Sequence, residues 1–117
     1  MKCIIPGSYD PVTVGHLDII IRAAQIFDEV WAVVFVNSSK QTAFSGELRL
    51  KMLAAACEGI GNVKTALSDG MLVDFMRERG IKYIVKGVRD GSDFDYEYKI
   101  ANINRAAYRE AVTVILP

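Results

Sequence analysis

The sequence predicts an α/β fold, a doubly wound parallel sheet of five strands with helices on both faces. Five short apolar stretches alternate with four segments of helical periodicity, and short polar loops join them. Such alternation is typical of parallel strands connected by right-handed crossovers. The first stretches, at 2–5 and 30–36, are almost continuously apolar, as strands buried on both sides of a parallel sheet are.

Each element follows from a local pattern. We expect strands at 2–5, 30–36, 63–67, 81–85 and 111–116, the third at a sheet edge because it is the most polar. The first helix begins at His16-Leu17, and its inner face is expected to hold Leu17, Ile20, Ile21, Ala24 and Phe27. The second follows a Ser45 cap, with Leu48, Met52, Ala55 and Ala56 facing inward. The third follows the turn and cap at 68–70 and ends at Gly80, and the fourth follows a Ser92 cap and runs to about Arg105.

Composition narrows the possible functions. The chain of 117 residues is expected to form one domain, 1–117. Its 14 basic and 14 acidic side chains balance, so it lacks the excess positive charge that is typical of proteins that bind nucleic acid. It has no apolar run long enough to span a membrane and no signal-peptide pattern at its start, so we expect a cytoplasmic protein. Cys3 and Cys57 lack metal-ligand spacing and are expected to be buried free thiols, and no residue is predicted to bind a metal.

The unusual polar residues cluster where the strands end. Loops at 6–16, 37–42, 68–70 and 86–91 all follow strands, and the carboxyl ends of parallel strands are where α/β sheets bind ligands. The first of these loops leads into a helix N-terminus and carries His16, the single histidine. Backbone N–H groups there favour an anion, most often phosphate. We therefore predict a site for phosphorylated ligands at this edge of the sheet.

Each residue also has an ordinary structural explanation. Lys40, Lys86 and Arg89 would singly be surface charges, but three cations on three strand-end loops favour a clamp for anionic substrates. His16 alone would be a helix-start residue with a backbone partner. Asp10 favours a structural turn over a metal ligand.

The stretch from Gly7 to His16 resembles the first signature of the nucleotidyltransferase superfamily, G-x-F-D-x-x-H/T-x-G-H. Its T-x-G-H form, the Ser-Ser-Lys ending at Lys40 and the Lys-Gly-Val-Arg beginning at Lys86 are similar to bacterial phosphopantetheine adenylyltransferases, as is Asp-Phe-Asp-Tyr-Glu at 93–97. The resemblance covers the whole chain and implies a Rossmann-like fold. It also implies transfer of the adenylyl group of ATP to 4′-phosphopantetheine, which forms dephospho-coenzyme A and pyrophosphate. Mg²⁺ would accompany ATP, and the family assembles as a homo-oligomer, usually a hexamer.

The resemblance implies roles for individual residues. His16 is expected to bind ATP and to stabilise the transition state. The other residues expected to bind ATP are Ser8, Tyr9, Gly87, Val88, Arg89 and Glu97. Those expected to bind phosphopantetheine are Ser8, Lys40, Leu72 and Lys86. Dephospho-coenzyme A or coenzyme A is an expected product or feedback ligand.

The chain departs from the family pattern in several places. Ser8, Tyr9 and Lys86 stand where the family often has Thr, Phe and Arg. Family members also continue past the position of Pro117 through a serine-rich signature that begins another phosphate-binding helix. Two alternatives are therefore kept. One is a C-terminally truncated, weakly active or inactive homologue that binds coenzyme-A-type ligands or nucleotide, and the other is a nucleotidyltransferase with a different phosphorylated acceptor.

Overall fold

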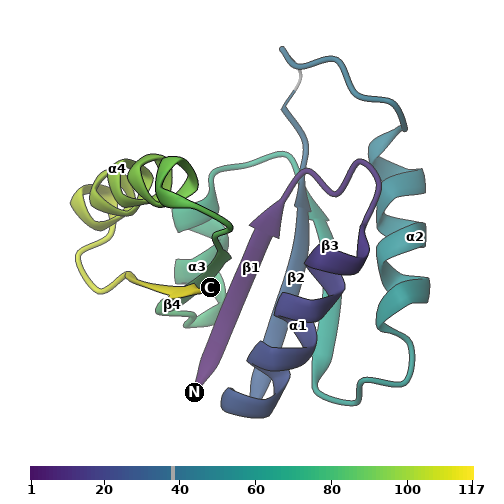
Figure 1. Cartoon of the computed structure of the whole chain (residues 1–117), viewed down its shortest axis with the longest axis horizontal. Helices are drawn as coiled ribbons and strands as arrows, with labels where there is room; N and C mark the ends of the chain where they lie inside the picture. Colours follow the sequence, from purple (N-terminus) through teal and green to yellow (C-terminus); the bar gives the residue numbers. More distant parts are fainter. Residues whose placement is uncertain (38) are drawn as a thin grey trace.

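The computed structural model describes residues 1–37 and 39–117, so Ser38, part of the loop expected after the second strand, lies outside the described residues. Five parallel strands form one sheet in the order β3-β2-β1-β4-β5 (Figure 1). The strands are β1 (Lys2–Gly7), β2 (Glu29–Phe35), β3 (Val63–Ser68), β4 (Tyr83–Gly87) and β5 (Val112–Leu116). The helices are α1 (Val14–Ile26), α2 (Gly46–Cys57), α3 (Leu72–Arg79) and α4 (Gly91–Ala107). The predicted fold class is confirmed, and β3 is an edge strand as expected.

The strand order reverses between β1 and β4. From β1 the chain proceeds to β2 and β3 on one side, and it then returns to place β4 and β5 on the other. Cys3 and Ile4 of β1 pair with Tyr83 and Ile84 of β4. A crevice at such a reversal, outside the carboxyl ends of the strands, is the usual ligand site of doubly wound sheets.

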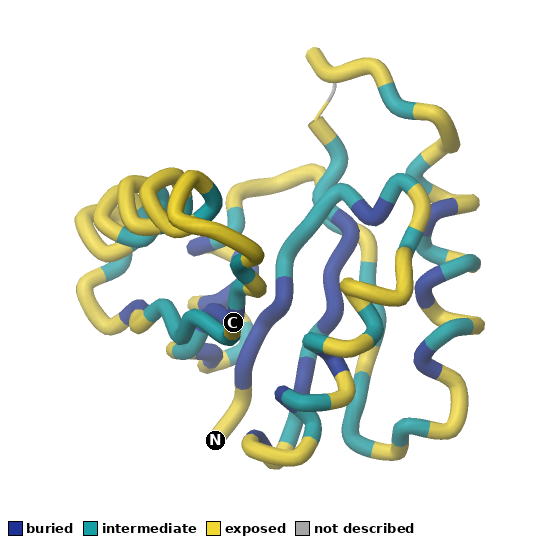
Figure 2. Tube along the Cα trace, viewed as in Figure 1, coloured by how far each residue is buried: buried dark blue, intermediate teal, exposed yellow. Residues whose placement is uncertain are grey.

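Alternate residues of each strand face opposite layers. Cys3 and Ile5 pack with α1 and α2, whereas Ile4 packs with α3. Figure 2 shows that burial is concentrated on the central strands and on the helix faces that cover them, while α4 is mostly exposed. Both cysteines are free and buried as predicted, and burial raises the pKa of Cys3 to about 12.

We expect Ile4→Ala to lower the free energy of unfolding by about 2–5 kcal/mol, because a fully buried side chain leaves a cavity when it is truncated. Ile4 is 0% exposed and pairs with Trp31 of β2 and Ile84 of β4 in the centre of the sheet. Urea denaturation measures the change. Ile103→Ala is the matched control, since Ile103 on α4 is 63% exposed and should change stability by less than about 0.5 kcal/mol. Equal effects of the two substitutions would contradict this account of the core.

Helix α2 buries a different face from the one that the sequence predicts. In α2 the buried residues are Arg49, Leu53 and Cys57, spaced by four, whereas Leu48 is exposed. The expected inner face is therefore wrong, because backbone carbonyls from other loops give the Arg49 guanidinium partners inside the protein. The hydrophobic pattern of the sequence does not predict those carbonyl partners.

Three helices also begin at residues other than those predicted. Asp90 rather than Ser92 caps α4, since its carboxylate accepts from the Asp93 N–H at 2.9 Å. Helix α1 starts at Val14 after a Thr13 cap, earlier than expected. Helix α3 follows Met71, which makes no side-chain cap, and the Ser68 hydroxyl accepts from the Gly70 N–H to form the turn before it. Gly80 ends α3 in the left-handed conformation, as predicted.

Candidate active site

The loop between β1 and α1, residues 8–13, ends in a capping box. The His16 N–H donates to Thr13 Oγ1 at 3.3 Å, and the Thr13 N–H donates to His16 Nδ1 at 3.0 Å. Because Nδ1 accepts a backbone N–H, it carries no proton itself, and the neutral ring bears its proton on Nε2. The capping box therefore holds an imidazole whose Nε2–H is a donor at the first turn of α1. The helix dipole makes that position favourable for an anion.

Tyr9 lies beneath the imidazole. Its ring is 1% exposed, its centroid is 4.9 Å from that of His16, and its hydroxyl donates to the Ile5 carbonyl at 2.7 Å. Burial raises the pKa of the phenol well above its ordinary range, so the hydroxyl stays protonated. The expectation that Tyr9 contacts the nucleotide does not fit this placement, because the whole residue is inside the core. Tyr9 supports His16 from below.

Lys86 brings positive charge to the same place from β4. The pKa of His16 lies below its ordinary value, first because the ring is partly withdrawn from water and second because of the Lys86 charge. Two residues seventy positions apart in the chain thus share one electrostatic environment at the sheet reversal. The arrangement keeps the imidazole neutral near neutral pH, as a hydrogen-bond donor that carries no charge of its own.

A proton NMR titration tests this arrangement, because His16 is the chain's single histidine. We expect a pKa below the ordinary 6.5, and a rise toward that value in Lys86→Met. Between the lowered pKa and 6.5 the unfolded chain binds more protons than the folded one, so the free energy of unfolding falls as pH falls through that window. A His16 pKa above 6.5, or one unchanged in Lys86→Met, would contradict the arrangement.

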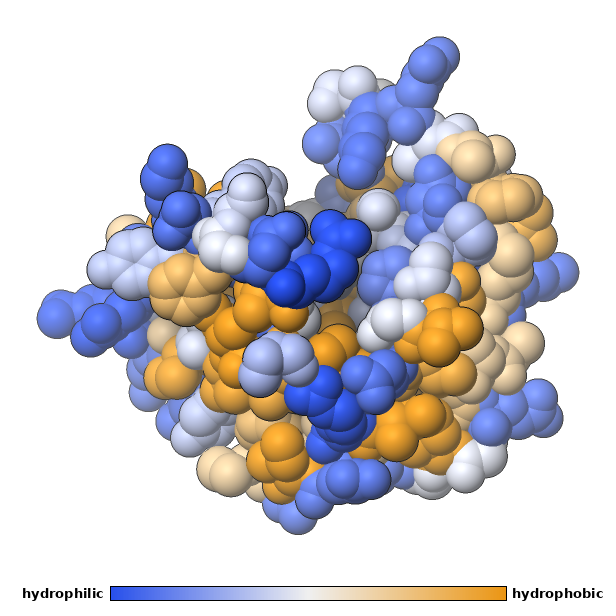
Figure 3. All heavy atoms as spheres, viewed as in Figure 1, coloured by the Kyte–Doolittle hydropathy of each residue, from blue (hydrophilic) through white to orange (hydrophobic). Residues whose placement is uncertain are grey.

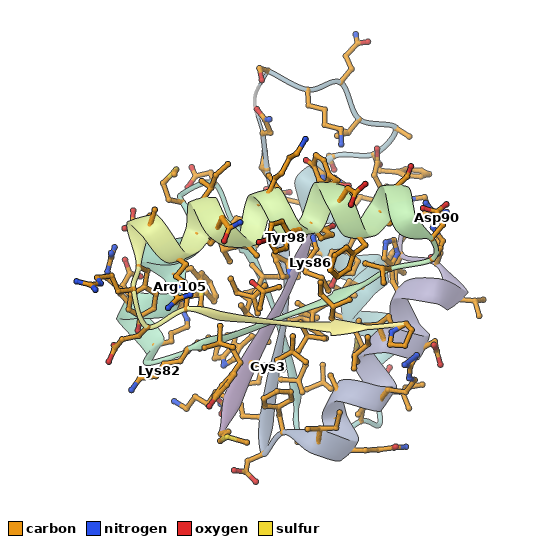
Figure 4. All side chains as sticks on the ribbon, turned by 60° about the vertical axis from the view of Figure 1, so that its left-hand side comes forward. Cys3, Lys82, Lys86, Asp90, Tyr98 and Arg105 are labelled. Atoms are coloured by element: carbon orange, nitrogen blue, oxygen red, sulfur yellow. The ribbon has the colours of Figure 1, made fainter. Side chains whose placement is uncertain are left out.

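Lys86 also pairs with α4. Its Nζ lies 3.3 Å from Glu97 Oε2, and the two side chains are only 26% and 13% exposed. Figure 4 shows Lys86 on β4 beneath α4, with Asp90 at one end of the helix and Arg105 toward the other. The pair lines a cavity of about 30 Å³ together with Pro6 of β1 and Leu72 of α3. The predicted residues Leu72, Lys86 and Glu97, from three elements, are therefore brought together.

Gly87 and Arg89 complete the β4 side. A Cβ on Gly87 would lie 2.8 Å from Cγ1 of Ile19, so glycine allows the end of β4 to approach α1 closely. The Val88 N–H donates to the Leu116 carbonyl at 3.1 Å, which holds the following loop to the end of β5. Arg89 Nε donates to Asp93 at 3.1 Å and lowers the pKa of that carboxyl. The guanidinium is otherwise exposed at the first turn of α4.

Lys40 stands apart from this group. It lies in the loop between β2 and α2, whose described residues 36–37 and 39–45 rise above the sheet in Figure 1 and carry the hydrophilic surface at the top of Figure 3. Its N–H donates to the Asn37 carbonyl at 3.0 Å. Within residues 1–37 and 39–117, no hydrogen bond or ion pair joins Lys40 to another predicted site residue. The structure places it over the same edge of the sheet, on a separate loop.

Asp10 and Arg49 connect the β1–α1 loop to the β2–α2 loop. The Asp10 carboxylate accepts from the Ala43 N–H at 2.7 Å and from the Phe44 N–H at 2.9 Å. Arg49 donates to the carbonyls of Phe44 and Ser8 at 3.1 and 2.8 Å. The Asp10 contacts agree with the structural role expected for it. Arg49 was not predicted from the sequence, and its one signal was the spacing of four from Leu53 and Cys57.

In the described part of the chain, no group of three or more His, Cys, Asp or Glu side chains is placed to hold a metal ion. None of the helices there has the length and apolar character that crossing a bilayer requires.

Comparison with known proteins places the chain in a family. The cytidylyltransferase-like family matches residues 4–116. A phosphopantetheine adenylyltransferase from Symbiobacterium thermophilum is 51% identical over 105 residues, which are 90% of this chain and 65% of that protein. One from Clostridium novyi is 47% identical over 113 residues, 97% of this chain and 70% of that protein. The chain thus spans roughly two thirds of the length of these relatives.

Solved structures share the fold at low identity. A lipopolysaccharide core biosynthesis protein from Thermoplasma volcanium superposes with a TM-score of 0.73 at 18% identity, covering 100% of this chain and 96% of that one. A bifunctional NMN adenylyltransferase/ADP ribose pyrophosphatase from Francisella tularensis superposes with a TM-score of 0.67 at 18% identity, covering 99% and 36%. These likenesses show a common α/β architecture. The sequence matches go further, and on them the chain belongs to the phosphopantetheine adenylyltransferase family of cytidylyltransferase-like proteins.

Proposed function

We propose that the chain transfers the adenylyl group of ATP to 4′-phosphopantetheine and releases pyrophosphate. The observation that carries this proposal is the His16 Nε2–H, presented at the start of α1 and next to the positive charge of Lys86. An uncharged donor, a helix N-terminus and a nearby cation suit a reaction in which phosphate oxygens gain charge. Membership of the family supports the choice of both substrates.

The proposed step is a single in-line displacement. A phosphate oxygen of phosphopantetheine attacks the α-phosphorus of ATP, the bond to the bridging oxygen of the β-phosphate breaks, and pyrophosphate leaves with that electron pair. His16 Nε2 donates to an oxygen of the α-phosphoryl group as charge builds on it. No covalent intermediate on the protein is needed, so the contribution of the chain is positioning and electrostatic stabilisation.

Lys86, Leu72 and Lys40 are proposed to hold phosphopantetheine. Lys86 supplies charge for its phosphate, and Glu97, at 3.3 Å, orients the ammonium group. Leu72 supplies apolar contact in the same cavity. Arg89, with Gly87 and Val88, lies on the β4–α4 side and is proposed to face the ATP phosphates.

Mg²⁺ belongs to the substrate in this proposal. The described residues contain no cluster of three or more metal-ligating side chains, and Mg²⁺ in nucleotide sites is held largely by substrate phosphates and water. We therefore assign Mg²⁺ to the ATP phosphates, with which it enters, and we assign it no ligand from the described residues.

Pyrophosphate release tests the function. The protein is mixed with MgATP and phosphopantetheine, and pyrophosphate is followed with a coupled assay. We expect release that saturates with both substrates and is absent without the acceptor. If pyrophosphate is released with nicotinamide mononucleotide but not with phosphopantetheine, nicotinamide mononucleotide is the acceptor in place of phosphopantetheine. If calorimetry shows saturable binding of phosphopantetheine but no pyrophosphate is released, the chain is a binding protein and the proposed activity is contradicted.

A further inference from the structure

We infer that Arg49 is a positioning residue that holds Ser8 against the β2–α2 loop and thereby aligns the part of the site that grips phosphopantetheine. The inference rests on the proposed function and adds a residue to it. Arg49 lies on α2, away from the β1–β4 reversal, and nothing in its local sequence marks it as functional.

The burial of Arg49 is unusual. Its side chain is 2% exposed, and it is the one charged residue buried in the described part of the chain. No carboxylate lies within 4.0 Å of its guanidinium among those residues, and the partners are the neutral carbonyls of Phe44 and Ser8. An arginine is rarely buried without an acid, since removing its charge from water is costly.

The two carbonyls belong to the two loops that carry predicted phosphopantetheine contacts. Ser8 is itself one such residue, and Phe44 lies in the loop that holds Lys40. The guanidinium fork thus joins chain segments 36 residues apart in a fixed geometry, which a lysine cannot reproduce.

Asp10 provides a second link between the same loops. Its carboxylate accepts the N–H groups of Ala43 and Phe44, while Arg49 takes the Phe44 carbonyl. Residues 43–44 are therefore held on both their donor and their acceptor sides. The Ser45 cap and the buried Leu53 stabilise α2 itself, whereas the Asp10 and Arg49 contacts tie the loop before α2 to the β1–α1 loop. It suits a loop whose small displacement would misplace a substrate.

Substitutions at Arg49 separate positioning from stability. We expect Arg49→Met to raise the KM for phosphopantetheine by about tenfold or more, with the KM for ATP changing less, because a lost charged hydrogen bond at the loop weakens binding by about that factor. Arg49→Lys keeps the charge and one carbonyl contact and should recover part of the loss. Calorimetric titration with phosphopantetheine should show the same order of affinities. Arg77→Met is the control, since Arg77 donates to the Ala107 carbonyl near the opposite end of α4.

The outcomes distinguish the possibilities. A fall in kcat that follows the folded fraction, with both KM values unchanged, would make Arg49 purely structural and overturn the inference. If Arg49→Met does not fold, Arg49→Lys and Asp10→Ala take its place, and each should raise the same KM. If the wild type binds phosphopantetheine and both of these variants bind it with the same affinity, the role of Arg49 is overturned while the proposed function stands. Absence of binding by the folded wild type overturns this inference together with the proposed function.

Discussion

Replacing His16 with glutamine is expected to lower the rate of pyrophosphate release by about 10²–10³, the usual effect of removing one donor to a developing oxyanion. The structure makes this variant a clean test. His16 occupies the third position of α1, where a capping box normally has Glu or Gln. Glutamine can therefore keep the contact with the Thr13 N–H while it removes the imidazole Nε2–H. Steady-state kinetics at saturating substrate measures the loss.

Thr13→Ala is the matched control for His16. It removes the side-chain cap, which typically costs about 0.5–2 kcal/mol of stability, but it leaves the imidazole in the chain. We expect a lower melting temperature with a much smaller loss of turnover than in His16→Gln. A glutamine variant that melts like the wild type and turns over at the wild-type rate would remove His16 from the mechanism.

Replacing Lys86 with methionine is expected to raise the KM for phosphopantetheine by about 100-fold. Truncating one partner of a buried charge pair typically costs about 2–5 kcal/mol in binding, and about 2.8 kcal/mol within that range corresponds to a 100-fold change. The loss has two parts. The substrate phosphate loses a cation, and Glu97 keeps its negative charge in the same cavity, only 13% exposed.

A double-mutant cycle separates these two parts. Lys86→Met combined with Glu97→Gln removes the unpaired carboxylate and should recover a measurable share of the affinity, because neighbouring charges do not act additively. Lys86→Arg keeps the charge and should stay within about tenfold of the wild type. If Lys86→Met binds phosphopantetheine as tightly as the wild type, Lys86 only pairs with Glu97 and does not contact the substrate.

Much of the site was predictable because its parts are local. Thr13 and His16 are three residues apart and form one capping box, so the sequence contains the whole unit. The positions of Lys86 and Gly87 follow from the end of a short apolar strand. Once alternation of strands and helices indicated a parallel sheet, the carboxyl ends of its strands had to lie at one edge. The resemblance to a known family then named the chemistry.

The errors concern residues whose environment comes from distant parts of the chain. Tyr9 was expected to contact the nucleotide, but it is buried in the core cluster that β1 and α1 help to form. Leu48 was expected inside because it is apolar, yet α2 turns Arg49 inward toward carbonyls of two loops. The contact of Glu97 with ATP stays a prediction, but the sequence did not indicate that Glu97 pairs with Lys86 from another element. In each case the deciding partner is more than ten residues away or in another layer.

Local pattern was thus sufficient for the α/β class, for the approximate place of every strand and helix, and for the edge of the sheet that carries the site. It was sufficient because side-chain periodicity and capping act over three or four residues. Which polar groups are buried, and which charges pair, depended on the packing of α2 and α4 against the sheet. Hydrogen bonds and ion pairs need partners within about 3–4 Å, and only the folded chain brings Arg49 to Ser8 or Lys86 to Glu97.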